Sequence, residues 1–289
     1  MSGLSGIWLW RGVVTAVSAL LIFLYLRGWR KNLQPSIFRS IIPFLAGLTI
    51  LFIVLATPLH QLAAHYFFVH TAQHLLLIAW IPALLLASDP LPVLVAGLPD
   101  GLWARWRDKR PSPAWQSRLR FLTAPGTVWL MFICNFWLWY DPTFHQATLE
   151  HSWVRGIEVS SLLATAGLYW WHITGCAPHW HNQHSLIGRI AFTFVATMPI
   201  KIVGLILLFT PETTYTYPQQ GIAGIIFDAE QMGGMMVWAL GGVVFAWTAV
   251  YLARQWLGSE DDKPVLPGSL WDTQEAMLAP GINKPTPTD

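Results

Sequence analysis

Long runs of apolar residues recur along the chain and constrain its fold more than any other feature. A helix needs about 20 mostly apolar residues to cross the hydrocarbon core of a bilayer. Hydrophobic residues make up 54% of the sequence and charged residues only 11%. Seven segments are long and apolar enough to span a membrane: residues 7–26, 41–59, 66–87, 124–140, 153–172, 187–209 and 224–253. The sequence therefore predicts an all-α integral membrane protein with seven transmembrane helices.

The positive charges predict how these helices are oriented, because cytoplasmic loops beside membrane helices collect Lys and Arg. Most basic residues follow the first and third predicted helices, whereas segments 60–65, 141–152 and 210–223 contain none. This pattern places the N-terminus outside and the C-terminus in the cytoplasm. Because the basic residues serve topology, the net charge of +2 gives no reason to expect a nucleic-acid partner. Membrane lipid is the expected surrounding partner.

The last part of the sequence differs from the rest in composition. Residues 258–289 contain Gly, Pro, Asp and Thr and show no apolar periodicity. Such a segment lacks the apolar surface needed to form a core. We expect residues 1–257 to form the transmembrane domain and residues 258–289 to form a disordered cytoplasmic tail.

Six histidines lie in or beside hydrophobic segments, at the ends where Lys and Arg are missing: His60, His65, His70, His74, His145 and His151. Residues four apart on a helix face the same way, so His70 and His74 form a ready pair of ligands. Polar groups at that depth in a membrane are costly and usually functional. The pair therefore indicates metal ligation or proton chemistry on the outer face.

The seventh predicted helix adds a second row of donors. Asp228, Met232 and Met235 are spaced to fall on one stripe of a helix, and thioethers together with imidazoles suit Cu(I). The alternative is that the methionines face lipid or fill packing gaps. Gly233 and Gly234 would let another helix approach closely.

Three charged residues are expected at a similar depth in different helices. An isolated Lys or carboxylate inside a membrane would be expensive. We therefore expect Lys201 to pair with Asp228 or Glu158, with the histidines beside that pair.

A second group of possible ligands lies in the loop between the fifth and sixth predicted helices. It consists of Cys176, His179, His181 and His184, with His172 just before them, a density sufficient for a metal but without a standard zinc spacing. A polar turn that meets lipid headgroups explains the same residues.

Several segments together resemble the CtaG family of cytochrome c oxidase assembly factors, in the polytopic form associated with caa-type oxidases. The resemblance covers about residues 60–250 and rests on segments 70–77, 81–86, 140–151, 169–171, 199–204, 217–219 and 228–238. It implies a bacterial inner-membrane, multi-pass protein of the respiratory chain that is needed to form active oxidase, through copper delivery or insertion. The sequence departs from the family pattern at Glu230.

The residues and the resemblance point to the same kind of protein. We expect a non-enzymatic assembly factor, a metallochaperone whose partners are oxidase subunits and other copper chaperones. The expected copper ligands are His70, His74, Asp228, Met232 and Met235, with His60, His65, His145 and His151 at the mouth of the pocket. The alternatives are an intramembrane haem-binding or redox enzyme and a copper transporter.

Overall fold

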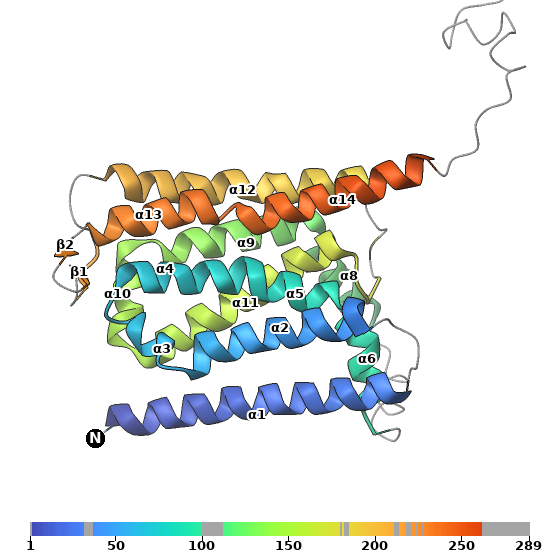
Figure 1. Ribbon diagram of the computed structural model, residues 1–289, viewed down its shortest axis with the longest axis horizontal. Helices are drawn as coiled ribbons and strands as arrows, with labels where there is room; N and C mark the ends of the chain where they lie inside the picture. The colour runs from blue at the N-terminus through green and yellow to red at the C-terminus, as the bar shows by residue number, and fades with distance from the viewer. Residues whose placement is uncertain are drawn as a thin grey trace, which may run out of the picture.

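Long helices lie side by side in one bundle in the computed structural model (Figure 1). The model describes residues 2–31, 37–99, 112–179, 181, 185–210, 214–217, 221–222, 225–226 and 228–261. The long helices are α1 (Ser2–Lys31), α2 (Ile37–Ala56), α4 (Phe67–Leu75) with its continuations η1 (Leu76–Trp80) and α5 (Ile81–Ala87), α9 (Pro125–Trp139), α11 (Ser152–Thr174), α12 (Leu186–Phe209), and α13 (Ala229–Leu240) followed by α14 (Val243–Asp261).

Short elements lie at the two ends of this bundle (Figure 1). One end contains α3 (Leu59–Leu62), α10 (Pro142–Glu150) and an antiparallel ribbon of β1 (Gly221–Ile222) and β2 (Ile225–Ile226). The opposite end contains α6 (Pro90–Gly97) and α8 (Pro113–Leu122). We call the first of these ends the α10 end.

Each of the seven segments predicted to cross a membrane overlaps one of the long helices or helix series. By length and hydropathy, four spans in the described residues could cross a bilayer: 10–31, 67–87, 186–209 and 229–259. Helices α8 and α9, which meet at a bend of 56°, form a fifth if they count as one span. The described chain is therefore helical and of membrane type. Helix α14 continues to Asp261, past the predicted boundary at residue 257, and the rest of the predicted tail lies outside the described residues.

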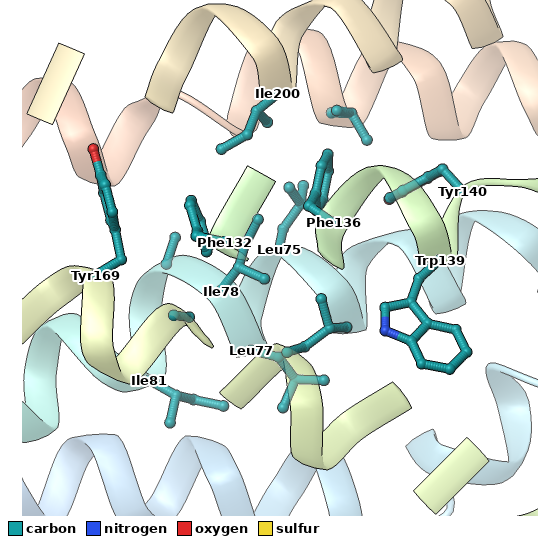
Figure 2. Packing of buried hydrophobic residues seen from close by; sticks show 14 of the residues in the cluster. Leu75, Leu77, Ile78, Ile81, Phe132, Phe136, Trp139, Tyr140, Tyr169 and Ile200 are labelled. Carbon is teal, nitrogen blue, oxygen red and sulfur yellow. The ribbon is translucent and has the colours of Figure 1, made fainter. Parts of the chain in front are cut away.

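The core of the bundle forms around the α4–η1–α5 series, which packs against α9 and α11 (Figure 2). Leu77, Ile78 and Ile81 are completely buried there. The rings of Phe132 on α9 and Tyr169 on α11 stack with centroids 4.7 Å apart. Apolar packing thus fixes α4 and α11 side by side, and these are the helices that carry the buried polar residues described below.

A π-helical turn interrupts the central helix series just before Pro82. Proline has no N–H, so the Ile78 carbonyl loses its usual partner four residues further on. The Trp170 indole of α11 donates to that carbonyl at 2.8 Å. A side chain from a neighbouring helix thus satisfies the freed backbone group, as an apolar interior requires.

Glycines let α13 approach two neighbours closely. A Cβ on Gly234 would lie 2.7 Å from the Leu208 backbone nitrogen of α12, and one on Gly204 would lie 2.6 Å from the Trp238 nitrogen. A Cβ on Gly233 would lie 2.5 Å from the Phe67 ring of α4. The predicted close approach at Gly233 and Gly234 is confirmed, and it fixes which face of α13 points into the bundle.

Candidate metal centre

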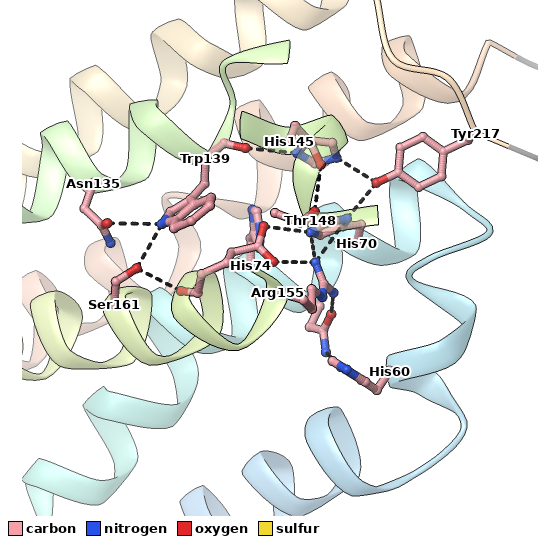
Figure 3. Close-up of polar contacts among 12 residues, drawn as sticks. His60, His70, His74, Asn135, Trp139, His145, Thr148, Arg155, Ser161 and Tyr217 are labelled. Atoms are coloured by element: carbon pink, nitrogen blue, oxygen red, sulfur yellow. Dashed lines mark hydrogen bonds and ion pairs between the residues drawn. The ribbon is translucent and has the colours of Figure 1, made fainter. Parts of the chain in front are cut away.

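Two histidines and a glutamate form a buried group between α4 and α11 (Figure 3). His70 and His74 occupy successive turns of α4, and Glu158 reaches them from α11. Glu158 Oε1 lies 3.0 Å from His70 Nε2 and 2.8 Å from His74 Nε2. The three side chains are at most 1% exposed, and their potential ligand atoms all lie within 4.8 Å of one another.

Arg155 brings a positive charge into the same group. It precedes Glu158 by one turn of α11, and its Nη1 donates to Glu158 Oε2 at 2.6 Å. The same Nη1 contacts His70 Nε2, and Nη2 contacts Gln73 Oε1. Because Arg155 is 8% exposed, its guanidinium needs the carboxylate as a counter-charge.

A chain of hydrogen bonds fixes the protonation of His70. The Trp139 carbonyl can only accept, so His145 Nδ1 carries the proton of that 2.9 Å bond. His145 Nε2 then accepts from the Tyr217 hydroxyl at 2.7 Å. The Tyr217 oxygen in turn accepts from His70 Nδ1 at 2.6 Å. His70 Nε2 then carries no proton, so it accepts from Arg155 Nη1, and its approach to the acceptor-only Glu158 Oε1 at 3.0 Å is not a hydrogen bond.

Burial supports the neutral state of the outer members of this chain. Removal from water lowers the pKa of His145 to about 4 and raises the pKa of Tyr217 well above its usual range. Both groups are therefore uncharged at neutral pH. A metal-bound histidine usually donates its second ring N–H to a neighbouring acceptor, and Tyr217 supplies that acceptor for His70.

A further contact leads from the group toward α3. Gln73 Nε2 donates to the Val54 carbonyl at 2.9 Å and lies 3.2 Å from His60 Nδ1. The His60 ring stacks on Trp10 of α1 with centroids 6.0 Å apart. Burial and the nearby Arg155 charge lower the pKa of His60 to about 4, against the opposite influence of Glu158. Gln73 thus connects Arg155 to a partly buried neutral imidazole.

The donors present suit a transition metal. Imidazole nitrogens and a carboxylate oxygen bind Cu²⁺ and Zn²⁺ well. His74 Nδ1 is buried and has no hydrogen-bond partner among the described residues, so this ring can hold its proton on Nδ1 while Nε2 binds an ion. His70, His74 and Glu158 therefore fit a metal, in a three-ligand arrangement.

The structure brings together only some of the residues predicted from sequence. His70, His74 and His145 gather at the centre, with His70 and His145 ring centroids 4.4 Å apart, and His60 reaches it through Gln73. His65 and His151 are exposed; His65 Nδ1 bonds to the Gln61 carbonyl.

The predicted ligands on α13 lie elsewhere. Met232 and Met235 are 37% and 58% exposed, whereas the histidine pair is buried. Asp228 is exposed and caps α13 by accepting from the Glu230 and Gln231 amides. The methionines lie away from the histidines because of the way α13 is rotated. The face of α13 that meets α4 and α12 consists of Gly233 and Gly234.

The structure corrects the expectation that Lys201 pairs with Asp228 or Glu158. Glu158 pairs with Arg155 of its own helix, and the Lys201 ammonium lies over the Trp238 ring, 5.5 Å from its centroid. A cation over an indole face is a favourable arrangement that needs no carboxylate.

Sequence reasoning placed Gln73 beside the histidine pair, but it missed Arg155 and Tyr217 as members of the centre and treated Glu158 only as a partner for Lys201. One signal was available, because an Arg and a Glu three residues apart in an apolar helix face the same side. Tyr217 lies in a loop between α12 and α13, so no helical periodicity could indicate its position.

The second predicted ligand cluster forms a polar turn near α8. His172 Nε2 and His181 Nε2 donate to the carbonyl and hydroxyl of Thr123 at 2.9 Å. His179 Nε2 bonds to the Gly175 carbonyl. Burial raises the pKa of the Cys176 thiol, and His184 lies outside the described residues. These three histidines already serve as hydrogen-bond donors to Thr123 and Gly175.

Fold and centre together define a polytopic helical membrane protein with a buried His–His–Glu–Arg group. The chain belongs to the cytochrome c oxidase caa3 assembly factor family, whose model matches residues 20–259.

Uncharacterised proteins of Mycobacterium bovis and Mycobacterium tuberculosis are each 27% identical over 85% of this chain and 38% of their own length. One of Mycobacterium leprae is 22% identical over 86% of this chain and 39% of its own. The chain thus spans well under half the length of these relatives. No solved structure matches.

Proposed function

We propose that this protein binds copper at His70, His74 and Glu158 and passes it on during the assembly of cytochrome c oxidase in the bacterial inner membrane. The supporting observation is the buried group of two imidazoles and a carboxylate within 4.8 Å of one another. It occurs in a chain whose family assembles this oxidase. The role proposed is that of a metallochaperone without catalytic activity.

The proposed topology has seven transmembrane helices, with the N-terminus outside and the C-terminus in the cytoplasm. Helices α2 and α11 are not among the spans given by length and hydropathy, yet both lie within the bundle beside those that are. In this topology the α10 end, which lacks Lys and Arg in segments 60–65, 141–152 and 214–217, faces outward. Oxidase subunits and other copper chaperones would dock at that end.

The ligand set proposed from the structure differs from the one expected from sequence. The two exposed methionines do not belong to it, so nitrogen and oxygen donors replace thioethers. Such donors bind copper as Cu²⁺ well and accept Zn²⁺ also. When copper is bound, Tyr217 and His145 keep the His70 ring in the orientation and tautomer that present Nε2.

The haem alternative finds little support in this geometry. The rings of His70, His74 and His145 lie in direct contact, with centroids 4.4 to 6.3 Å apart. A porphyrin between two of them would force α4 and α10 apart.

Copper stoichiometry of the detergent-purified protein tests the proposal. Wild type is compared with His70→Ala/His74→Ala after loading with Cu⁺, Cu²⁺ or Zn²⁺ and desalting. The matched control is His65→Ala/His151→Ala, which removes two exposed imidazoles from the same end. We expect about one copper per chain in wild type and control, and loss in the first variant.

Equal copper in all three proteins would contradict the assignment of the site. An absence of copper in each of them would leave an assembly factor that acts without metal. An absorption spectrum of the same samples would reveal a haem and would then favour the alternative of a haem-binding enzyme.

A further inference from the structure

We propose that the Arg155 guanidinium is an internal competitor of the metal, which must leave His70 and Glu158 before an ion can bind there. This inference rests on the proposed function, because it concerns the regulation of the same site. It assigns to Arg155 the control of affinity and release.

The first step is that Arg155 uses the atoms that a metal would need. Its Nη1 contacts His70 Nε2 and lies 2.6 Å from Glu158 Oε2. The hydrogen-bond chain through Tyr217 leaves a lone pair on His70 Nε2. That lone pair can accept an Arg155 N–H or bind a metal, and it cannot do both.

The second step is electrostatic. With neutral histidines, Glu158 and Arg155 together carry no net charge in a site that is nearly closed to solvent. A metal ion beside the guanidinium would add one or two positive charges at a few ångströms, in a medium that screens charge poorly. Displacement of Arg155 removes this repulsion and returns the Glu158 carboxylate to the ion as its counter-charge.

The third step is a direction in which Arg155 can move. Its Nη2 already contacts Gln73 Oε1, and Gln73 continues to His60, which is only partly buried. Figure 3 shows Arg155 between the centre at His70 and the ring of His60. The guanidinium can therefore shift toward Gln73 and His60 without entering an apolar region.

The consequence is a site that releases its ion readily. When the metal departs, Arg155 returns to Glu158, so no buried charge is left without a partner. The apparent dissociation constant equals the intrinsic one divided by the fraction of molecules in which Arg155 has moved away. A low affinity of this kind suits a protein that passes its metal to another.

The test is the dissociation constant for Cu²⁺, measured by competition with a chelator in detergent. Arg155→Gln removes the positive charge and keeps an N–H donor for Glu158, while Arg155→Lys keeps the charge. We expect copper to bind at least tenfold more tightly to Arg155→Gln than to wild type, and Arg155→Lys to stay within about threefold of wild type.

Folding is checked on the same samples by thermal unfolding, because an unpaired Glu158 destabilises the bundle. If Arg155→Gln does not fold, Gln73→Leu serves as a second variant, because it keeps the Arg155–Glu158 ion pair and removes the group toward which the guanidinium would shift. We expect Gln73→Leu to bind copper more weakly than wild type, and equal or tighter binding would overturn the inference.

Unchanged or weaker copper binding by folded Arg155→Gln would overturn the inference while leaving the metal site in place. A loss of copper from all proteins, wild type included, would overturn the proposed function as well. Tight binding by Arg155→Gln and Arg155→Lys alike would show that the shape of the side chain at position 155, and not its charge, sets the affinity for copper. This outcome would also contradict the inference.

Discussion

At the scale of single residues, the direction of each hydrogen bond decides what the centre can do. The Trp139 carbonyl forces the proton of His145 onto Nδ1, and this choice passes through Tyr217 to His70. Residues that never touch a metal thus determine which nitrogen of His70 is available. Such outer partners commonly change metal affinity by 10- to 100-fold when they are removed.

Tyr217→Phe tests this relay. The substitution removes the hydroxyl that accepts from His70 Nδ1 and donates to His145 Nε2. We expect copper affinity to fall about 10- to 100-fold while the protein stays folded, as checked by a chelator titration and circular dichroism. Tyr215→Phe is the control, because its hydroxyl bonds to the Tyr140 carbonyl outside the relay. Equal losses in both variants would argue against the relay.

The partly buried His60 predicts a pH dependence of stability. Its pKa is lowered from 6.5 to about 4 on folding, so between these values the unfolded chain binds the proton more readily. Stability from this group is complete above pH 6.5 and is lost as the pH falls toward 4, by at most about 3 kcal/mol. His60→Gln should therefore weaken the pH dependence of the unfolding temperature between pH 7 and pH 4. His65→Gln, which replaces a neighbouring exposed histidine, should keep the wild-type slope; equal slopes in all three proteins would contradict the assignment.

At the scale of helices, close backbone contacts set the rotation of each element. Gly204 and Gly234 bring α12 and α13 together, and Gly233 seats α13 against α4. This arrangement turns Met232 and Met235 away from the histidines. In an apolar medium such close packing is a main source of helix association.

Gly204→Ala tests the contact between α12 and α13. The added Cβ would lie 2.6 Å from the Trp238 nitrogen, so the helices must separate at a cost of about 1–3 kcal/mol. Gly167→Ala is the matched control, since a Cβ there would meet no atom of the described part of the chain within 4 Å. The better helix propensity of alanine should leave that variant unchanged or more stable by up to about 1 kcal/mol. Thermal unfolding in detergent distinguishes the two; a Gly204→Ala protein as stable as Gly167→Ala would refute the contact.

At the scale of the whole molecule, the proposed orientation puts the α10 end on the outer side of the membrane. The buried centre lies near this end, because His145 of α10 contacts His70 and His60 of α3 contacts Gln73. An ion would then enter and leave from the side on which the proposed partners present themselves.

Cysteine labelling tests this orientation. Thr143 at the α10 end and Ser185 at the opposite end are both exposed. In a background without Cys134 and Cys176, Thr143→Cys should react with a membrane-impermeant maleimide in intact cells. Ser185→Cys should react only after the inner membrane is opened. The reverse pattern would invert the orientation, and reaction of both in intact cells would show that the two ends face the same side.

Features that depend only on neighbours along one helix could be predicted from the amino-acid order: the apolar runs that form the long helices, and the His70–His74 pair. Both follow from local periodicity, which any helix imposes. The tertiary structure alone decided which helix faces meet. It placed Glu158 and Arg155 of α11 against the histidines, added Tyr217 from a loop, and directed the α13 methionines outward. These outcomes depend on side-chain volumes and glycine contacts between distant segments, which no pattern within a single helix encodes.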